Sequence, residues 1–349
     1  MKIGTLLFAC FVGAAPLQAQ QNAQLPANTQ ETAAPVIRVS SRLVVLDVLV
    51  KNKKTGAPID HLEAKDFAVE EDGQPQQIST FSRDVLPLSV VLLFDLTDTV
   101  RPVLKPLAGG AFEILGHLKP QDHVAIMVFS SHTGLLQDFT TNRALAAAAI
   151  EKASNMKSSD GTFIHEDMYE AVKEALHAKQ ADSRRVLVWL TDGTANVENS
   201  FSQEIIGTEA PARLHTKEEA TSKLMKSDVV VAALIERSAA TDAVIAAADV
   251  TPFGFIAGAR LGDINHYADI TGGPVLKTSK KEVATRLAEL IDELRARYTL
   301  GYVPLGTKPP GTFCKTEVKL LPAAYKEHPE LRKSDVVVRT RRGYYRGGE

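Results

Sequence analysis

The chain has 349 residues, of which 44% are hydrophobic and 23% are charged, and this balance excludes disorder for most of its length. The length corresponds to roughly two domains with a sizeable core. The 40 basic and 42 acidic residues give a formal net charge of −2 and are dispersed along the sequence. No basic segment therefore indicates nucleic acid or an anionic membrane surface as a partner.

The first residues have the pattern of a secretory signal peptide. Lys2 is followed by an apolar run over residues 5–15, the helix-breaking Pro16 and the small Ala19. This pattern predicts a signal peptide over residues 1–19 and a secreted or periplasmic protein, with a buried N-terminal helix as the alternative. The polar residues 20–35 predict a disordered linker, and no later stretch is apolar for long enough to span a bilayer.

The two cysteines bear on stability. Cys10 lies in the signal peptide, where it leaves a lipid-modified terminus open as an alternative. Cys314 is then the only cysteine of the mature chain, so no intramolecular disulfide is expected. Stability must come from the core and from a metal, if one is bound.

A small antiparallel β-unit is predicted for residues 36–87. Residues 43–50 are rich in β-branched side chains and lead into a turn at residues 53–56. A second strand around residues 67–70 reaches Asp72-Gly73, a strong hairpin signal, before a third strand around residues 78–81.

From residue 88 onward, short apolar runs alternate with helical patterns, which is typical of parallel strands covered on both faces. Strands are predicted at residues 89–94, 123–129, 186–190, 229–235 and 274–276. Helices are predicted at residues 103–118, 144–153, 165–178, 217–225 and 281–297. The fold class is therefore α/β, with a doubly wound, mostly parallel, Rossmann-like sheet over residues 88–297.

Strand patterns return in the C-terminal segment, residues 298–349. They lie at residues 298–303, 316–321 and 336–340. We expect this segment to pack with residues 36–87 into a β-sandwich-like unit, with the α/β domain inserted between its two halves.

Oxygen-bearing side chains follow the strands of the predicted sheet. Asp95, Thr97 and Thr99 come directly after the first strand, and Asp192 follows a later one. Thr162 precedes a helix. Ligands bind in open α/β sheets at the carboxyl ends of the strands, and oxygen atoms are the ligands that hard cations such as Mg²⁺ prefer. The loops that carry these five residues are therefore the predicted site for a hard cation.

The three motifs resemble the metal-ion-dependent adhesion site of von Willebrand factor type A domains. They are Asp95-x-Thr97-x-Thr99, Gly161-Thr162 and Thr191-Asp192-Gly193. The resemblance covers about residues 88–298, includes the segment 268–273, and extends in the flanks to secreted bacterial proteins that carry related domains. The family more often has serine where this chain has Thr97 and Thr99.

The resemblance implies how the site works. Thr97, Thr99 and Thr162 would coordinate the ion directly, whereas Asp95 and Asp192 would act mostly through bound water. The cation would be Mg²⁺, with Mn²⁺ or Ca²⁺ as alternatives, and its open position would accept an Asp or Glu of a partner protein. The implied function is a secreted adhesion or scaffold module that is not an enzyme.

Two other functions remain open. A Mg²⁺-dependent phosphatase of the haloacid dehalogenase type also places an aspartate after an apolar strand, but it needs a second carboxylate two residues later, where this chain has Thr97. A structural module with a vestigial metal site is the other alternative. The sequence has no histidine or cysteine pair at zinc spacing.

Four further features of the sequence carry local predictions. Asp98 is expected to point away from the ion, and Trp189 to lie in the core. His165 to Asp167 are expected to form a solvated first turn of a helix, because consecutive helical residues do not share a face. Residues 194–216 form an unusually long connection and are predicted to be part of the partner-binding rim.

Overall fold

The computed structural model describes residues 43–83, 86–98, 100–157, 162–180, 182–193, 214–237, 261–306 and 308–347. The predicted signal peptide, the linker of residues 20–35, Thr99 and most of the segment 194–216 lie outside the described residues. None of the described helices is long and apolar enough to cross a membrane.

Within the described residues, six strands form the central sheet, in the order β10-β9-β8-β5-β6-β7. Their bounds are β5 (Leu88–Asp95), β6 (His123–Phe129), β7 (Thr133–Thr140), β8 (Arg184–Thr191), β9 (Val230–Glu236) and β10 (Val275–Thr278). All neighbouring pairs are parallel except β6 and β7. The predicted α/β class is confirmed, and β7 is an antiparallel edge strand that the sequence analysis did not predict.

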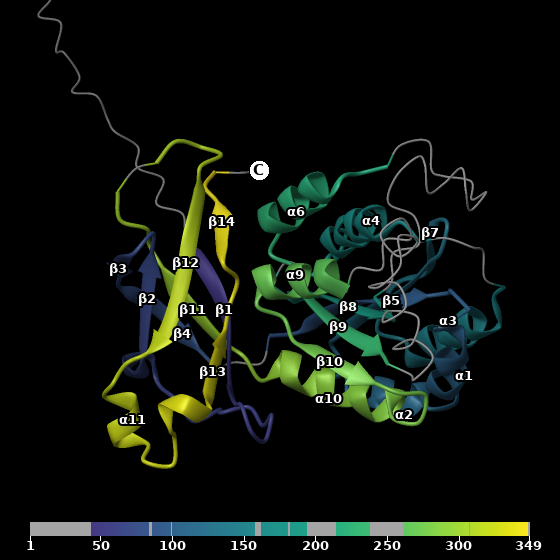
Figure 1. The fold of residues 1–349 in the computed structure, drawn as a ribbon, viewed down its shortest axis with the longest axis horizontal. Helices are drawn as coiled ribbons and strands as arrows, with labels where there is room; N and C mark the ends of the chain where they lie inside the picture. The colour runs from purple at the N-terminus through teal and green to yellow at the C-terminus, as the bar shows by residue number, and fades with distance from the viewer. Residues whose placement is uncertain are drawn as a thin grey trace, which may run out of the picture. The chain divides into compact units, whose positions relative to one another are not determined.

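Helices cover both faces of this sheet (Figure 1). One face carries α1 (Arg101–Gly109), α2 (Ala111–Gly116), α3 (Arg143–Asn155) and α10 (Val283–Arg295). The other carries α4 (Ile164–Leu176), α6 (Lys217–Lys226) and α9 (Leu261–Thr271). Every residue of β5 is buried, because alternate side chains pack against opposite helical layers. The helix predicted over residues 103–118 is divided at Gly109-Gly110, since glycine weakens a helix interior.

Strands from both parts of the chain that flank the α/β domain pair with one another. One sheet has the order β13-β1-β11-β4 and the other β14-β12-β2-β3. The bounds are β1 (Val44–Asn52), β2 (Phe67–Glu71), β3 (Gln74–Gln76), β4 (Ile78–Ser82), β11 (Tyr298–Tyr302), β12 (Phe313–Leu320), β13 (Val336–Arg339) and β14 (Gly343–Tyr345). Side chains of both sheets share one hydrophobic core, so the two sheets form a β-sandwich. The boundaries at residues 36–87, 88–297 and 298–349 remain predictions.

The hairpin at Asp72-Gly73 differs from the expected one. Both residues have positive φ, 50° and 80°, as a type I′ turn requires. The turn joins β2 to the short strand β3, and β4 instead pairs with β11 in the opposite sheet. Sequence periodicity does not show a three-residue strand, so β3 was not predicted.

Arg184, at the start of β8, connects the α/β domain to the chain on both sides of it. Its backbone N–H donates to the carbonyl of Pro87 at 2.8 Å, where the chain enters the domain. Its Nη1 donates to the carbonyl of Leu294 at 3.1 Å, where the chain leaves, and its Nη2 pairs with Asp47 Oδ1 at 2.9 Å. One buried arginine therefore holds both connections and strand β1.

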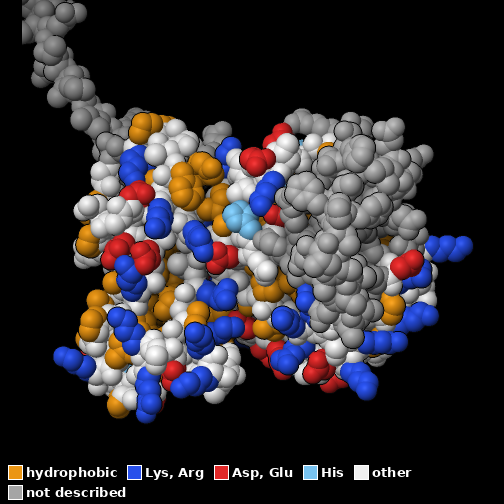
Figure 2. All heavy atoms as spheres, viewed as in Figure 1, with side chains coloured by type: hydrophobic (Ala, Val, Ile, Leu, Met, Phe, Trp, Pro, Cys, Tyr) orange, Lys and Arg blue, Asp and Glu red, His pale blue; other side chains and the backbone are white. Residues whose placement is uncertain are grey.

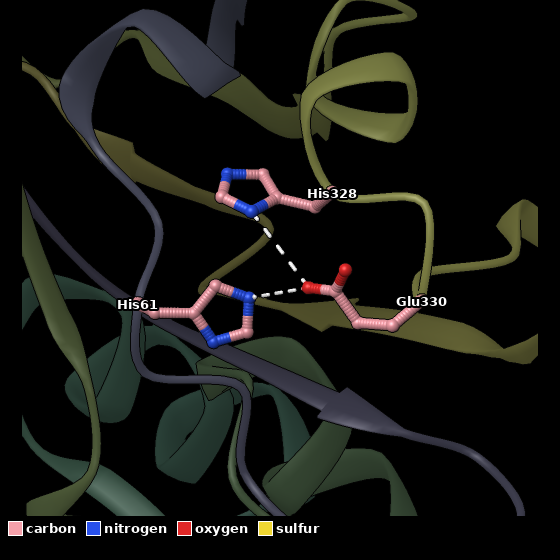
Figure 3. A group of neighbouring side chains, drawn as sticks. All are labelled: His61, His328 and Glu330. Atoms are coloured by element: carbon pink, nitrogen blue, oxygen red, sulfur yellow. Dashed lines mark hydrogen bonds and ion pairs between the residues drawn. The ribbon is translucent and has the colours of Figure 1, made fainter.

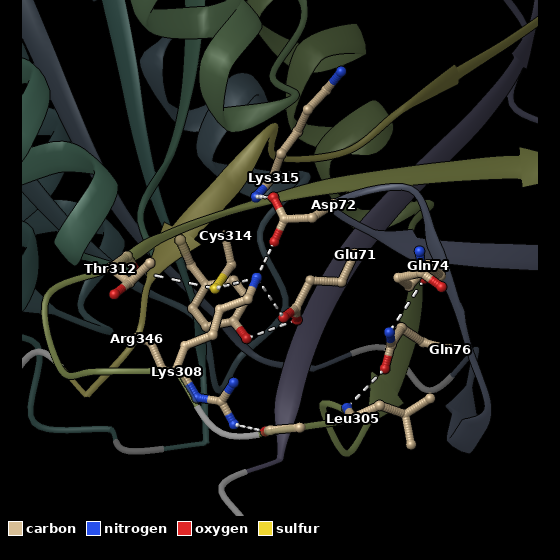
Figure 4. Close-up of polar contacts among 12 residues, drawn as sticks. Glu71, Asp72, Gln74, Gln76, Leu305, Lys308, Thr312, Cys314, Lys315 and Arg346 are labelled. Atoms are coloured by element: carbon tan, nitrogen blue, oxygen red, sulfur yellow. Dashed lines mark hydrogen bonds and ion pairs between the residues drawn. The ribbon is translucent and has the colours of Figure 1, made fainter.

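Charges of both signs are interspersed over the face of the molecule that Figure 2 shows, in keeping with the dispersed charge of the sequence. Inside the sandwich, Glu71 accepts hydrogen bonds from the hydroxyls of Tyr302 and Tyr344, each at 2.8 Å. Lys308 lies beside the same carboxylate, 3.7 Å from Oε1, and also pairs with Asp72 (Figure 4). This cluster fixes β2 and β14 to the segment that precedes β12.

Cys314 on β12 lies next to this cluster and is fully buried. Burial and the charge of Glu71 raise the pKa of its thiol, which lowers its reactivity because the thiolate is the nucleophile. In a chain that lacks residues 1–19, we expect a thiol reagent at pH 8 to label less than about a tenth of Cys314 in the time that labels it fully in denaturant. Equal rates in both conditions would contradict the burial of this thiol.

Candidate functional site

Two aspartates meet where adjacent parallel strands end. Asp95 is the last residue of β5, and Asp192 directly follows β8. These strands are neighbours in the sheet, and the hydroxyl of Thr191 donates to Asp95 Oδ2 at 2.8 Å. Asp95 is 0% exposed and Asp192 is 1% exposed. The fold therefore places two carboxyl groups in a buried position at the carboxyl edge of the sheet.

The turn after β5 presents Thr97 to the same position. The backbone N–H of Thr97 donates to Asp95 Oδ1 at 2.8 Å, and the side chain is only 6% exposed. The carbonyl of Thr97 accepts from the N–H of Arg101 as α1 begins. Asp98 is exposed and pairs with Arg101 at 3.0 Å. The predicted outward orientation of Asp98 is confirmed.

Thr162 is fully buried and lies just before α4. The expectation of a solvated first turn in this helix is wrong. His165 Nδ1 lies 2.8 Å from the hydroxyl of Tyr267, and Glu166 Oε2 lies 2.7 Å from both the backbone nitrogen and Nδ1 of His215. Consecutive residues do point in different directions, but neighbouring elements cover each of those directions.

Asp167 is the residue of this turn that bears on the site. It is 1% exposed, and its Oδ1 accepts a hydrogen bond from the hydroxyl of Thr133 at 2.6 Å. Its Oδ2 has no hydrogen-bond partner in the part of the chain that the structure describes. The sequence offered one signal for this burial, since position 167 lies three residues after Ile164 and four before Ala171, on the apolar stripe of α4.

The surroundings of Asp95 and Asp167 disfavour the ionised form of both carboxyl groups. Burial, reinforced by the charge of Asp192, raises the pKa of Asp95 to about 7. Burial also raises the pKa of Asp167 well above its ordinary range, and the charges of Asp95 and Glu166 add to the effect. No Lys, Arg or His within the described ranges forms an ion pair with Asp95 or Asp167. A buried carboxylate without an ion-pair partner is stabilised either by protonation or by a bound cation.

The arrangement fits a hard divalent cation. Asp95, Thr97 and Asp192 are buried at this edge of the sheet, Thr162 is buried just before α4, and all four side chains offer only oxygen atoms. The Asp167 oxygen that has no hydrogen-bond partner among the described residues is a further acceptor, and the charge of Asp95 contributes to the raised pKa of this carboxyl. Thr99, the fifth predicted ligand, lies outside the described residues.

No family model matches the chain, and no curated protein matches it. Among solved structures, it is similar to the vWF domain of the type V pili tip protein Mfa5 from Porphyromonas gingivalis, with 11% identity, coverage of 65% of this chain and 99% of that chain, and a TM-score of 0.40. It is similar to BatB from Bacteroides thetaiotaomicron, with 14% identity over 59% and 98% of the two chains and a TM-score of 0.40. The SpRpn10 VWA domain gives 11% identity, 60% and 95% coverage, and a TM-score of 0.35.

Solved von Willebrand factor A domains are thus among the structures to which this chain is similar. The site motifs predict this family from the sequence. TM-scores this low add nothing on the function of the chain, which has to be inferred from the site itself.

Proposed function

We propose that the protein is a secreted module that binds a partner protein through a divalent cation held at the carboxyl ends of β5 and β8. The observation that supports this most is the buried group of Asp95, Asp167 and Asp192, in which only neutral groups donate to the first two. A cation would offset the repulsion among these carboxylates. Mg²⁺ is the first candidate, with Mn²⁺ and Ca²⁺ as alternatives.

The contacts of Asp95 support the division of roles among the ligands. One of its oxygens accepts from the N–H of Thr97 and the other from the hydroxyl of Thr191. This favours contact with the ion through bound water, so that Thr97, Thr99 and Thr162 supply the direct ligands. Neutral hydroxyls leave the cation most of its charge, and a carboxylate of the partner would complete its coordination.

The contacts around the aspartate favour binding over phosphatase chemistry. A phosphatase of the haloacid dehalogenase type would use Asp95 as nucleophile and a nearby carboxylate as acid and base. Asp98 is the nearest candidate in sequence, and it is exposed and paired with Arg101. Asp95 itself is buried, with both oxygens hydrogen-bonded.

Addition of Mg²⁺ at about a hundred times its dissociation constant is expected to raise the free energy of unfolding by about 2.7 kcal/mol. Asp192→Asn should abolish this increase, because it removes one of the charges that hold the ion. Urea denaturation with Mg²⁺ and with a chelator measures the effect. Asp98→Asn is the matched control and should behave like wild type, and a wild type without any increase would indicate a vestigial site.

Capture of a partner tests the second half of the proposal. Immobilised protein is incubated with the extracellular or envelope fraction, once with Mg²⁺ and once with a chelator. We expect proteins that bind only with Mg²⁺ to be lost with Asp192→Asn and retained with Asp98→Asn. The segment 194–216 directly follows this site, so deletion of residues 200–210 should weaken capture while leaving stabilisation by Mg²⁺ intact.

A further inference from the structure

Two histidines from distant parts of the sequence meet on the β-sandwich (Figure 3). His61 lies between β1 and the 3-10 helix η1 (Ala64–Asp66), and His328 follows α11 (Ala324–Glu327). Glu330 Oε1 is 3.0 Å from His61 Nε2 and 3.7 Å from His328 Nδ1. The three side chains each offer one ligand atom, and these atoms all lie within 4.8 Å of one another.

The backbone on either side of His61 is fixed. The hydroxyl of Tyr298 donates to the carbonyl of Ile59 at 2.8 Å and accepts from the N–H of Leu62 at 3.0 Å. Ile59 and Leu62 are both buried in the core of the sandwich. His61 is therefore presented by a connection that is held from both ends.

The segment that carries the other two side chains is fixed as well. The N–H of His328 donates to the carbonyl of Ala324, and the N–H of Leu331 donates to the carbonyl of His328, both at 2.9 Å. Ala324 and Leu331 are buried in the same core. The three side chains thus approach one another on a rigid support, which lowers the entropy lost when they bind a ligand.

Each imidazole has a second carboxylate near its other nitrogen, beyond hydrogen-bond distance. His328 Nε2 lies 3.7 Å from Oδ2 of the buried Asp66, and His61 Nδ1 lies 4.0 Å from Asp60 Oδ1. Histidines that ligate a metal commonly donate their remaining N–H to a carboxylate, which fixes the tautomer and the ring orientation. Both rings here turn one nitrogen toward Glu330 and the other toward such a group.

We propose that His61, His328 and Glu330 bind Zn²⁺. Ligand atoms about 2.1 Å from a tetrahedral zinc ion lie roughly 3.4 Å apart, and the distances of 3.0 and 3.7 Å to Glu330 lie on either side of that value. Imidazole suits zinc better than Mg²⁺, so this site differs in chemistry from the oxygen-only site of the α/β domain. Three protein ligands leave one position to water, and the ion joins the β1–η1 connection to the segment after α11.

Zinc binding is measured by calorimetry on a chain carrying Asp95→Ala, so that the site of the proposed function does not contribute. We expect one Zn²⁺ per chain, and affinity lowered at least about 100-fold by His61→Ala or Glu330→Gln and about tenfold by Asp60→Asn. Co²⁺ in place of Zn²⁺ should give visible absorption bands of a tetrahedral site.

His117→Ala is the matched control, because His117 pairs with Asp292 at 3.1 Å and has a similar exposure to His61. It should leave zinc affinity unchanged. Absence of stoichiometric zinc uptake, or equal affinity in His61→Ala and wild type, would overturn the proposal. Failure of Mg²⁺ to stabilise the protein has no effect on this result, so the two proposals fail separately.

Discussion

Replacement of Asp95 by Asn is expected to raise the free energy of unfolding of the metal-free protein at pH 7.5 by about 1–3 kcal/mol, and to abolish its stabilisation by Mg²⁺. Asn keeps the acceptor for the N–H of Thr97 while removing a buried charge next to Asp192. A substitution at the proposed binding site would thus stabilise the protein, because the site is organised for an ion.

The pH dependence has a definite sign. The pKa of Asp95 is about 7 in the folded protein, against an ordinary value of 3.8. Between these values the unfolded chain ionises this group while the folded chain keeps its proton, so the free energy of unfolding falls as the pH rises from about 4 to about 7 and this group causes no further loss above that range. The raised pKa of Asp167 acts in the same direction.

Urea unfolding with a chelator at pH 5 and pH 7.5 measures both effects. The decrease in the free energy of unfolding from pH 5 to pH 7.5 should be smaller in Asp95→Asn than in wild type. Asp98→Asn should show the same decrease as wild type. A metal-free Asp95→Asn protein that is less stable than wild type at pH 7.5 would contradict the electrostatic account of the site.

Gly273→Ala is expected to lower the free energy of unfolding by about 3 kcal/mol. A Cβ atom at this position would overlap the carbonyl oxygen of Val231 and lie 2.7 Å from its carbonyl carbon. Both atoms belong to the backbone of β9, an interior strand of the central sheet, so neither can move without breaking strand pairing. The N–H of Gly273 also donates to the carbonyl of Ala268 at 2.8 Å, which fixes the turn between α9 and β10.

Gly116→Ala provides the control in thermal and urea denaturation. A Cβ atom there meets nothing within 4 Å, and Gly116 is the last residue of α2. Alanine should therefore be neutral or stabilise the protein by up to about 1 kcal/mol. Similar effects of the two substitutions would show that Gly273 does not approach β9 as closely as described.

The strands of the central sheet could be predicted because burial on both faces requires near-continuous apolar runs, as in β5 and β8. The edge strand β7 could not, since its side chains are mostly half-buried and form no such run. The sequence does not predict helix α9, because only its final residues belong to a recognisable motif, which precedes a strand. Its buried Ile264, Tyr267 and Ala268 follow helical spacing.

The residues of the candidate sites also differ in whether the sequence predicts them. Asp95, Thr97 and Asp192 were predicted because strand ends converge in parallel sheets, a rule that applies without knowledge of side-chain packing. The burial of Asp167 depends on Thr133 and on neighbouring elements that sequence spacing does not reveal. Likewise, spacing rules detect metal ligands only when they are close in sequence, and His61 and His328 come together through the pairing of the two flanking segments.

The position of Arg184 implies an order of folding. Pairing of β1 with β11 closes a loop of roughly 250 residues, which costs about 5 kcal/mol in chain entropy if that loop is unfolded. A folded α/β domain already holds Pro87 close to Leu294 through Arg184, so the remaining closure is short. The sandwich should therefore assemble last. Until β11 and β13 have been synthesised, β1 has no strand to pair with. In that interval its unpaired edge is exposed to other chains, so a nascent copy is most prone to aggregation before it is complete.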